Sequence, residues 1–185
     1  MLNRHRAPGI EPRPLQTAKG LEHVTAEWVA VLRWLHANHV EHVLVGAAAT
    51  AIRGNADARG PVAVVPAPYG RNLERLARAL SAAHARVRVG GELDTMAVKL
   101  SAEKLASGER WMLRCGEHDL DVESRPTGVP RYQELLYEAG RFELEPGLPV
   151  EVASAEDLEH FDQGRRTGTP PEIKITRHAA PASRE

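Results

Sequence analysis

One segment constrains the fold of this chain more than any other: VLVGAAATAIRGNADARGPVAVVP, from Val43 to Pro66. An apolar run ends at Gly46, a stretch of small residues continues to Gly54, and a second apolar run occupies residues 62–65 after a polar loop. Runs rich in β-branched residues on both sides of a short helical stretch predict two neighbouring strands with a tight turn into a helix. Gly46 precedes three alanines, which leaves room for another backbone or a phosphate to approach closely.

Composition sets the outer limits on what this chain can be. Its 185 residues fit one domain, and with only 4% aromatic residues the core must rest on Ala, Val and Leu. A net charge of −1 gives no overall field that would draw the protein to nucleic acid or to a membrane surface. The single cysteine, Cys115, excludes an internal disulfide. No apolar run is long enough to span a membrane, and the N-terminal residues lack the apolar stretch of a signal peptide. We therefore expect a cytoplasmic protein.

Hydrophobic periodicity predicts both helices and strands, and the length of the chain predicts a single domain. A helix is expected from about Val24 with Thr25 as its N-cap, and an amphipathic helix over residues 72–83. Strands are expected at residues 110–115 and 118–123, joined by a turn.

The second of these strands carries acidic residues on one face. Asp119, Asp121 and Glu123 alternate with Leu120 and Val122, so the acids share one side of the sheet. The simpler interpretation is a half-exposed strand with its carboxylates in water. The more specific interpretation is that these carboxylates are the remnant of a catalytic site.

Several of these motifs together resemble one known family. They are the glycine turn at Gly46, the helix end near Gly54, the sequence Asp-Leu-Asp at 119–121, and Ser-Ala-Glu-Asp-Leu at 154–158. Over residues 24–163 the chain resembles the minimal nucleotidyltransferase fold of the DNA polymerase β superfamily, and within it the small bacterial toxin–antitoxin and abortive-infection type. The resemblance implies an α+β fold, in which a nucleotidyltransferase-like mixed β-sheet has flanking helices in a single domain.

The resemblance also implies roles for individual residues. Gly46 and Ala47 would stand at the nucleotide-binding turn, and Asp121 would be the third metal-binding carboxylate, with Asp119 as the second choice. The cofactors implied are Mg²⁺ and a nucleoside triphosphate.

The same comparison shows where this chain departs from the family. The two other metal-binding aspartates fall on Pro61 and Ala63, and a lysine expected in the last helix falls on Asp162. A proline and an alanine offer no side-chain oxygen to a metal ion. Two-metal catalysis needs carboxylates that hold both ions, so this pattern predicts a decayed active site.

Three hypotheses about function follow from these residues. The first is a catalytically degenerate nucleotidyltransferase-like protein that acts as a binding or regulatory partner of a protein encoded nearby. The second is an active metal-dependent nucleotidyltransferase that modifies a protein, RNA or small molecule. It would recruit carboxylates from the set Asp57, Glu92, Asp94 and Asp119. In the third, the resemblance is only architectural and the chain is an interaction module.

The ends of the chain have a different composition from its middle. Residues 1–20 combine arginines and prolines without apolar periodicity, which predicts a disordered arm before a domain at 21–163. Residues 164–185 are expected to form a flexible tail. Gly164 should place Arg165 and Arg166 outside the last helix.

Overall fold

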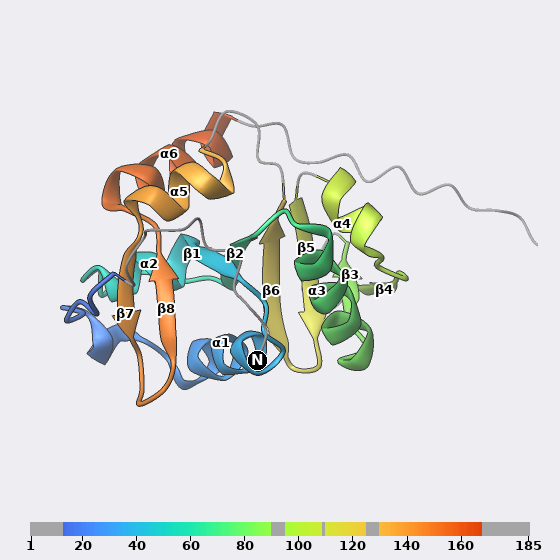
Figure 1. Cartoon of the computed structure of the whole chain (residues 1–185), viewed down its shortest axis with the longest axis horizontal. Helices are drawn as coiled ribbons and strands as arrows, with labels where there is room; N and C mark the ends of the chain where they lie inside the picture. The colour runs from blue at the N-terminus through green and yellow to red at the C-terminus, as the bar shows by residue number, and fades with distance from the viewer. Residues whose placement is uncertain (1–12, 90–94, 109, 125–129, 168–185) are drawn as a thin grey trace, which may run out of the picture.

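The computed structural model describes residues 13–89, 95–108, 110–124 and 130–167. Within these ranges the chain forms one eight-stranded mixed sheet and six α-helices (Figure 1), which confirms the predicted α+β class and the single domain. The strand order is β4-β3-β5-β6-β2-β1-β8-β7. No helix in the described part of the chain combines the length and apolar character needed to cross a membrane.

The strands follow one another along the chain in eight short segments. Their bounds are β1 His42–Val45, β2 Val62–Pro66, β3 Arg86–Arg88, β4 Thr95–Ala97, β5 Arg110–Cys115, β6 His118–Glu123, β7 Gly140–Glu143 and β8 Pro149–Val152.

Helix α1 precedes the first strand, and the other helices lie between strands or after the last of them. Their bounds are α1 Ala26–Ala37, α2 Gly46–Ile52, α3 Gly70–Ala82, α4 Ala102–Ser107, α5 Tyr132–Glu138 and α6 Ala155–Thr167, with a 3₁₀ turn at Leu21–His23. Helix α1 packs on β2 and β6, α3 packs on α4, and α2 packs on β1, β2 and α6. Helices α5 and α6 lie together at one end of the sheet (Figure 1).

The pairing of the central strands determines which side chains lie on the same face of the sheet. Strand β1 pairs antiparallel with β2, which places Val45 opposite Ala63. Strand β2 pairs in parallel with β6, which places Ala63 beside Asp121. Because paired residues project to the same face, the side chains of Ala63 and Asp121 lie on one side of the sheet.

The predicted elements of the first half and the long hairpin are present. Thr25 caps α1, because its hydroxyl accepts a hydrogen bond of 3.2 Å from the backbone N–H of Trp28. Strands β5 and β6 have the predicted bounds. Strand β4 and helix α4 were not predicted, since both are short and carry no strong periodicity.

The expected end of the last helix is wrong. Helix α6 runs through Gly164 to Thr167, so the backbone of Arg165 and Arg166 is helical. A glycine inside a helix costs about 1 kcal/mol relative to alanine. Capping at Ser154, whose hydroxyl accepts a hydrogen bond from the backbone N–H of Asp157, and the burial of Phe161 stabilise the helix against that loss.

Part of the expected N-terminal arm lies along the sheet. Arg13 donates hydrogen bonds to backbone carbonyls at the end of α5, and the backbone N–H of Gln16 donates to the carbonyl of Arg141 at 2.7 Å. A Cβ atom on Gly20 would lie 2.0 Å from the carbonyl oxygen of Ala51, so only glycine fits at this contact. Residues 1–12 of the expected arm and residues 168–185 of the expected tail lie outside the described residues.

A buried asparagine joins α3 to the ends of the central strands. Asn72 accepts a hydrogen bond of 2.8 Å from the N–H of Glu41 and donates to the carbonyls of Glu41 and Ala67 at 2.9 and 3.0 Å. Its amide therefore pairs with the N–H of Glu41 and the carbonyl of Ala67 next to β1 and β2, whereas the carbonyl of Glu41 also accepts from the N–H of Ala67 at 2.9 Å.

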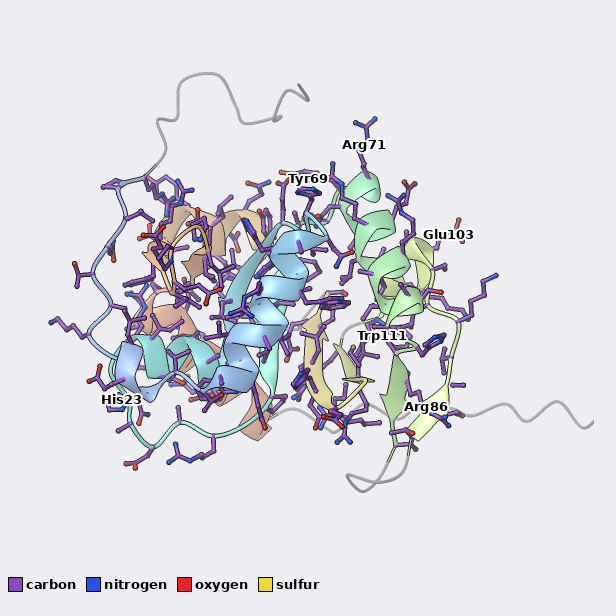
Figure 2. All side chains as sticks on the ribbon, turned by 90° about the horizontal axis from the view of Figure 1, so that it is seen from below. His23, Tyr69, Arg71, Arg86, Glu103 and Trp111 are labelled. Atoms are coloured by element: carbon purple, nitrogen blue, oxygen red, sulfur yellow. The ribbon has the colours of Figure 1, made fainter. Side chains whose placement is uncertain are left out.

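We predict that Asn72→Ala lowers the free energy of unfolding by about 1–3 kcal/mol, because the N–H of Glu41 and the buried carbonyl of Ala67 lose the partner that Asn72 supplies. Urea denaturation measures the change. Arg71→Ala is the control: Arg71 is the preceding residue of the same helix and points into solvent (Figure 2), so its loss should change stability by less than about 0.5 kcal/mol. Equal effects of the two substitutions would contradict the role of Asn72.

A histidine at the start of β1 is held in its neutral form. Burial lowers the pKa of His42, and this outweighs the opposing effect of its contact with the carbonyl of Val40 at 2.9 Å. A carbonyl oxygen only accepts, so Nδ1 carries the proton. Nε2 is buried without a hydrogen-bond partner among the described residues.

We predict that stability falls as the pH drops through about 6.5, because the unfolded chain then takes up a proton that folded His42 rejects. Above that pH the contribution of His42 is fully present. The slope from this one group is at most about 1.4 kcal/mol per pH unit. Urea denaturation between pH 7.5 and pH 5 measures it, and His42→Gln should flatten the dependence. An unchanged slope in that variant would rule out His42 as the cause.

Candidate functional site

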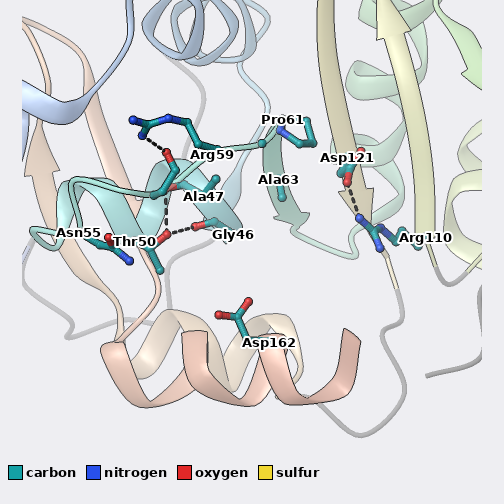
Figure 3. Close-up of a pocket in the computed structure, with 12 residues that line it drawn as sticks. Gly46, Ala47, Thr50, Asn55, Arg59, Pro61, Ala63, Arg110, Asp121 and Asp162 are labelled. Atoms are coloured by element: carbon teal, nitrogen blue, oxygen red, sulfur yellow. Dashed lines mark hydrogen bonds and ion pairs between the residues drawn. The ribbon is translucent and has the colours of Figure 1, made fainter. Parts of the chain in front are cut away.

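A cavity of about 230 Å³ opens at the end of β1 and the beginning of β2 (Figure 3). Helix α2, the loop before β2, the edge of the β5–β6 hairpin and helix α6 contribute its walls. The lining residues are Gly46, Ala47, Thr50, Asn55, Ala58, Arg59, Gly60, Pro61, Ala63, Arg110, Asp121 and Asp162.

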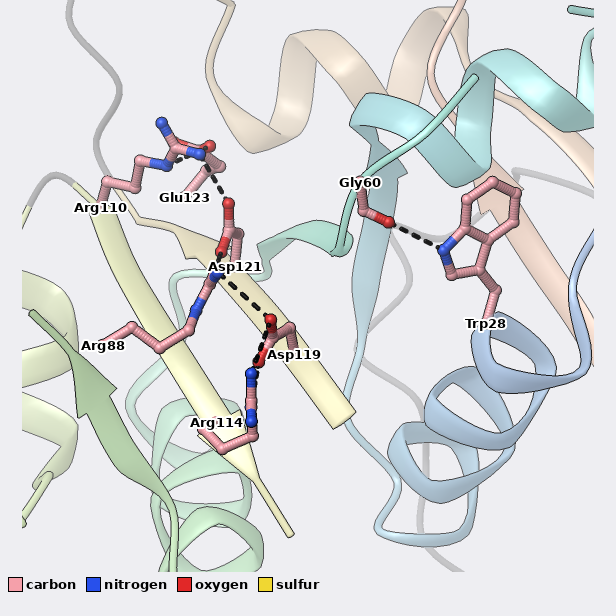
Figure 4. A network of polar contacts seen from close by, with 8 residues as sticks. All are labelled: Trp28, Gly60, Arg88, Arg110, Arg114, Asp119, Asp121 and Glu123. Carbon is pink, nitrogen blue, oxygen red and sulfur yellow. Dashed lines mark hydrogen bonds and ion pairs between the residues drawn. The ribbon is translucent and has the colours of Figure 1, made fainter. Parts of the chain in front are cut away.

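Long-range hydrogen bonds hold two of these walls in place. The indole N–H of Trp28, on α1, donates to the carbonyl of Gly60 at 3.0 Å and fixes the loop before β2 (Figure 4). The guanidinium of Arg53, at the end of α2, donates to the carbonyl of Ala153 at 2.8 Å and joins α2 to the start of α6. The cavity is therefore built from segments that are fixed to different parts of the fold.

The structure brings together most of the residues that the sequence singled out. The residues at the expected glycine turn, at the two expected aspartate positions, at the third carboxylate and at the expected lysine position all line this one cavity: Gly46, Ala47, Pro61, Ala63, Asp121 and Asp162. Asp119, the second choice for the carboxylate, lies two residues earlier on β6 and is not part of the lining.

Asp121 is the most buried charge at this site, with its side chain only 1% exposed. Each carboxylate oxygen has its own arginine: Nη2 of Arg88 lies 2.5 Å from Oδ1, and Nη2 of Arg110 lies 2.6 Å from Oδ2. Charge-assisted hydrogen bonds of this length are among the strongest polar contacts in proteins. The carboxylate is therefore fully engaged by two cations of the protein itself.

The same pattern continues along the sheet face (Figure 4). Arg88 also pairs with Asp119 at 3.3 Å, and Asp119 pairs in turn with Arg114. At the other end, Nε of Arg110 lies 3.2 Å from an oxygen of Glu123. We call this set the arginine–carboxylate network: Arg88, Arg110, Arg114, Asp119, Asp121 and Glu123. Its three guanidinium groups and three carboxylates alternate in space, so their charges cancel.

The network corrects the simpler interpretation of the acidic strand. The Asp121 and Glu123 side chains are 1% and 5% exposed, so these carboxylates do not face water. Burial lowers the pKa of Arg110, but its hydrogen bond to Asp121 and the charges of Glu123 and Asp121 outweigh burial and raise the pKa. The guanidinium therefore stays charged.

The residues present do not fit a pair of magnesium ions. Mg²⁺ prefers oxygen ligands in near-octahedral geometry, and the positions beside Asp121 are a proline ring and a methyl group. Both oxygens of Asp121 already accept from guanidinium groups, whose positive charges repel a dication.

The other carboxylates considered for recruitment do not complete a metal site. Asp57 is exposed in the loop after α2 and does not line the cavity, and Asp119 is bound to two arginines. Glu92 and Asp94 lie outside the described residues. Within the described ranges, no group of three His, Cys, Asp or Glu side chains is arranged to hold a metal ion.

Sequence reasoning missed the arginines of this site. A signal existed in the hairpin, because its register places Arg110 opposite Glu123 and Arg114 opposite Asp119. Alternation along the two strands was enough to pair them. Arg88 had no such signal, since it reaches Asp121 from β3, two strands away.

Comparison with models of known protein families finds no match to this chain, and no curated protein matches it either.

We predict that Asp121→Asn lowers the free energy of unfolding by about 1–3 kcal/mol, because two guanidinium groups lose the charge they share. The effect should be below that of a fully buried pair, since the Arg88 and Arg110 side chains are 17% and 28% exposed. Thermal or urea denaturation measures it.

Asp162→Asn is the matched control, because Asp162 lines the same cavity but forms no hydrogen bond or ion pair within the described residues. This substitution should change stability by less than about 0.5 kcal/mol. If the two variants lose the same stability, the arginine contacts of Asp121 do not stabilise the fold.

Proposed function

We propose that this chain is a catalytically degenerate protein with a nucleotidyltransferase-like fold that acts as a binding or regulatory partner. One observation carries the proposal: the carboxylate that the resemblance assigns to metal binding has both oxygens occupied by Arg88 and Arg110. In support, six residues that the resemblance singled out surround a single cavity, yet the residues at two of the expected ligand positions have no oxygen to offer.

The chemistry of nucleotidyl transfer explains why this arrangement favours an inactive site. Two divalent ions normally activate the attacking oxygen and neutralise the charge that develops on the phosphates. Arginines beside Asp121 supply positive charge, but a guanidinium cannot lower the pKa of a bound hydroxyl as a metal ion does. The site can therefore keep its shape without metal while lacking the activation step.

An active nucleotidyltransferase is the alternative, and no observation favours it. It needs further carboxylates near Asp121, and of the candidates only Asp57 and Asp119 are described. The first lies outside the cavity lining and the second is paired with Arg88 and Arg114.

Nucleotide binding at Gly46 and Ala47, and a protein partner of toxin–antitoxin type, remain predictions. The charged lining residues are Arg59, Arg110, Asp121 and Asp162, whose formal charges cancel. A triphosphate gains little from such a lining, so we expect at most weak nucleotide binding.

We predict that the purified full-length chain transfers no nucleoside monophosphate when incubated with Mg²⁺ or Mn²⁺, radiolabelled triphosphates, and candidate protein or RNA acceptors. The reason is the missing metal cage. Gel autoradiography measures incorporation, and titration calorimetry with Mg²⁺ and ATP measures binding in parallel.

Metal-dependent labelling that disappears in a folded Asp121→Asn variant and persists in Asp57→Asn would refute the proposal. The second variant removes an exposed carboxylate outside the cavity and controls for nonspecific loss of charge.

A further inference from the structure

The cavity contains polar groups that the protein itself leaves without partners. Within the described residues, Nδ2 of Asn55, Nη1 of Arg110 and both carboxylate oxygens of Asp162 form no hydrogen bond. The Thr50 hydroxyl donates to backbone carbonyls at the start of α2. Arg59 donates through Nη1 to carbonyls of its own loop, whereas its Nε and Nη2 form no hydrogen bond within the described residues.

The unpartnered groups have opposite signs and come from different walls. Asp162 points into the cavity from α6, whereas Arg110 belongs to the β5–β6 side (Figure 3). Asn55 adds a neutral donor from the loop after α2. An anion would be attracted by Arg110 but repelled by Asp162. A simple cation would be attracted by Asp162 but repelled by Arg110.

A ligand that satisfies both walls must therefore carry both charges. We propose that this cavity binds a small zwitterion, with an ammonium group at Asp162 and a carboxylate at Arg110. The charges of the lining cancel, which matches a ligand of zero net charge.

The size of the cavity supports a ligand of this class. Its volume of about 230 Å³ is below the range of about 300–1,000 Å³ that is typical of pockets for drug-sized molecules. A short amino acid is of suitable size, whereas a nucleoside triphosphate is both larger and strongly anionic. This inference rests on the proposed function, because a metal-loaded catalytic site would need the same space for a triphosphate.

The test is titration of the full-length, isotope-labelled chain followed by two-dimensional amide NMR. The probes are the zwitterions glycine, β-alanine, 4-aminobutyrate and 6-aminohexanoate, which vary the separation of the two charges. Butyrate and butylamine each keep one charge of 4-aminobutyrate, and ATP without metal tests the anionic alternative.

We expect at least one zwitterion to shift the amide resonances of Gly46, Ala47 and Asn55 and to bind at least about tenfold more tightly than either singly charged analogue. A tenfold ratio corresponds to about 1.4 kcal/mol. Asp162→Asn should remove the advantage of the zwitterion over butyrate. Asp57→Asn, which changes a nearby exposed carboxylate outside the cavity, should retain it.

Equal binding of the zwitterion and its analogues, tighter binding of ATP, or no effect of Asp162→Asn would overturn the inference. Absence of shifts across the whole zwitterion series at concentrations on the order of 10 mM would also overturn it. None of these results is evidence for catalysis, which the transfer assay tests separately. Metal-dependent transfer would instead defeat the proposed function, whatever the zwitterions do.

Discussion

The contact of Asp121 with Arg88 and Arg110 sets the character of the whole site. A carboxylate with a 1% exposed side chain needs strong compensation for the water it has lost, and here two guanidinium groups supply it. Those arginines come from β3 and β5, so the carboxylate also ties three strands together on one sheet face. Its fixed position in turn defines one wall of the cavity.

The pairing of β2 with both β1 and β6 explains how the cavity is assembled. Ala63 lies opposite Val45 on one side and beside Asp121 on the other, and α2 begins directly after Val45. The segment from β1 through α2 to β2 therefore lies beside β6, a strand that comes almost sixty residues later in the sequence. The small side chains of Ala47 and Ala63 leave the space between them open.

Much of this arrangement was accessible from the sequence, and the physical reasons are local. Alternation on the acidic strand and the turn expected between residues 115 and 118 predicted the β5–β6 hairpin, and Thr25 predicted the start of α1 as its N-cap. The position of Asp162 in the cavity followed only from the resemblance, since nothing near it in sequence indicates what α6 faces. The contact of Arg88 with Asp121 depends on how β3 joins the sheet, and long-range strand order leaves no mark in local periodicity. Helix α6 continues beyond Gly164 because burial of its apolar side outweighs the low helix propensity of glycine.

The hydrogen bond from Trp28 to Gly60 gives the protein an internal optical probe. Indole emission responds to changes in the polarity and hydrogen bonding of its surroundings, and this indole holds a loop that forms one wall of the cavity. A molecule that enters the cavity and moves that loop would alter the environment of the Trp28 indole, which is hydrogen-bonded to the loop. Trp28 is one of three tryptophans in the chain, so the part of the emission that comes from Trp28 would follow the position of this loop.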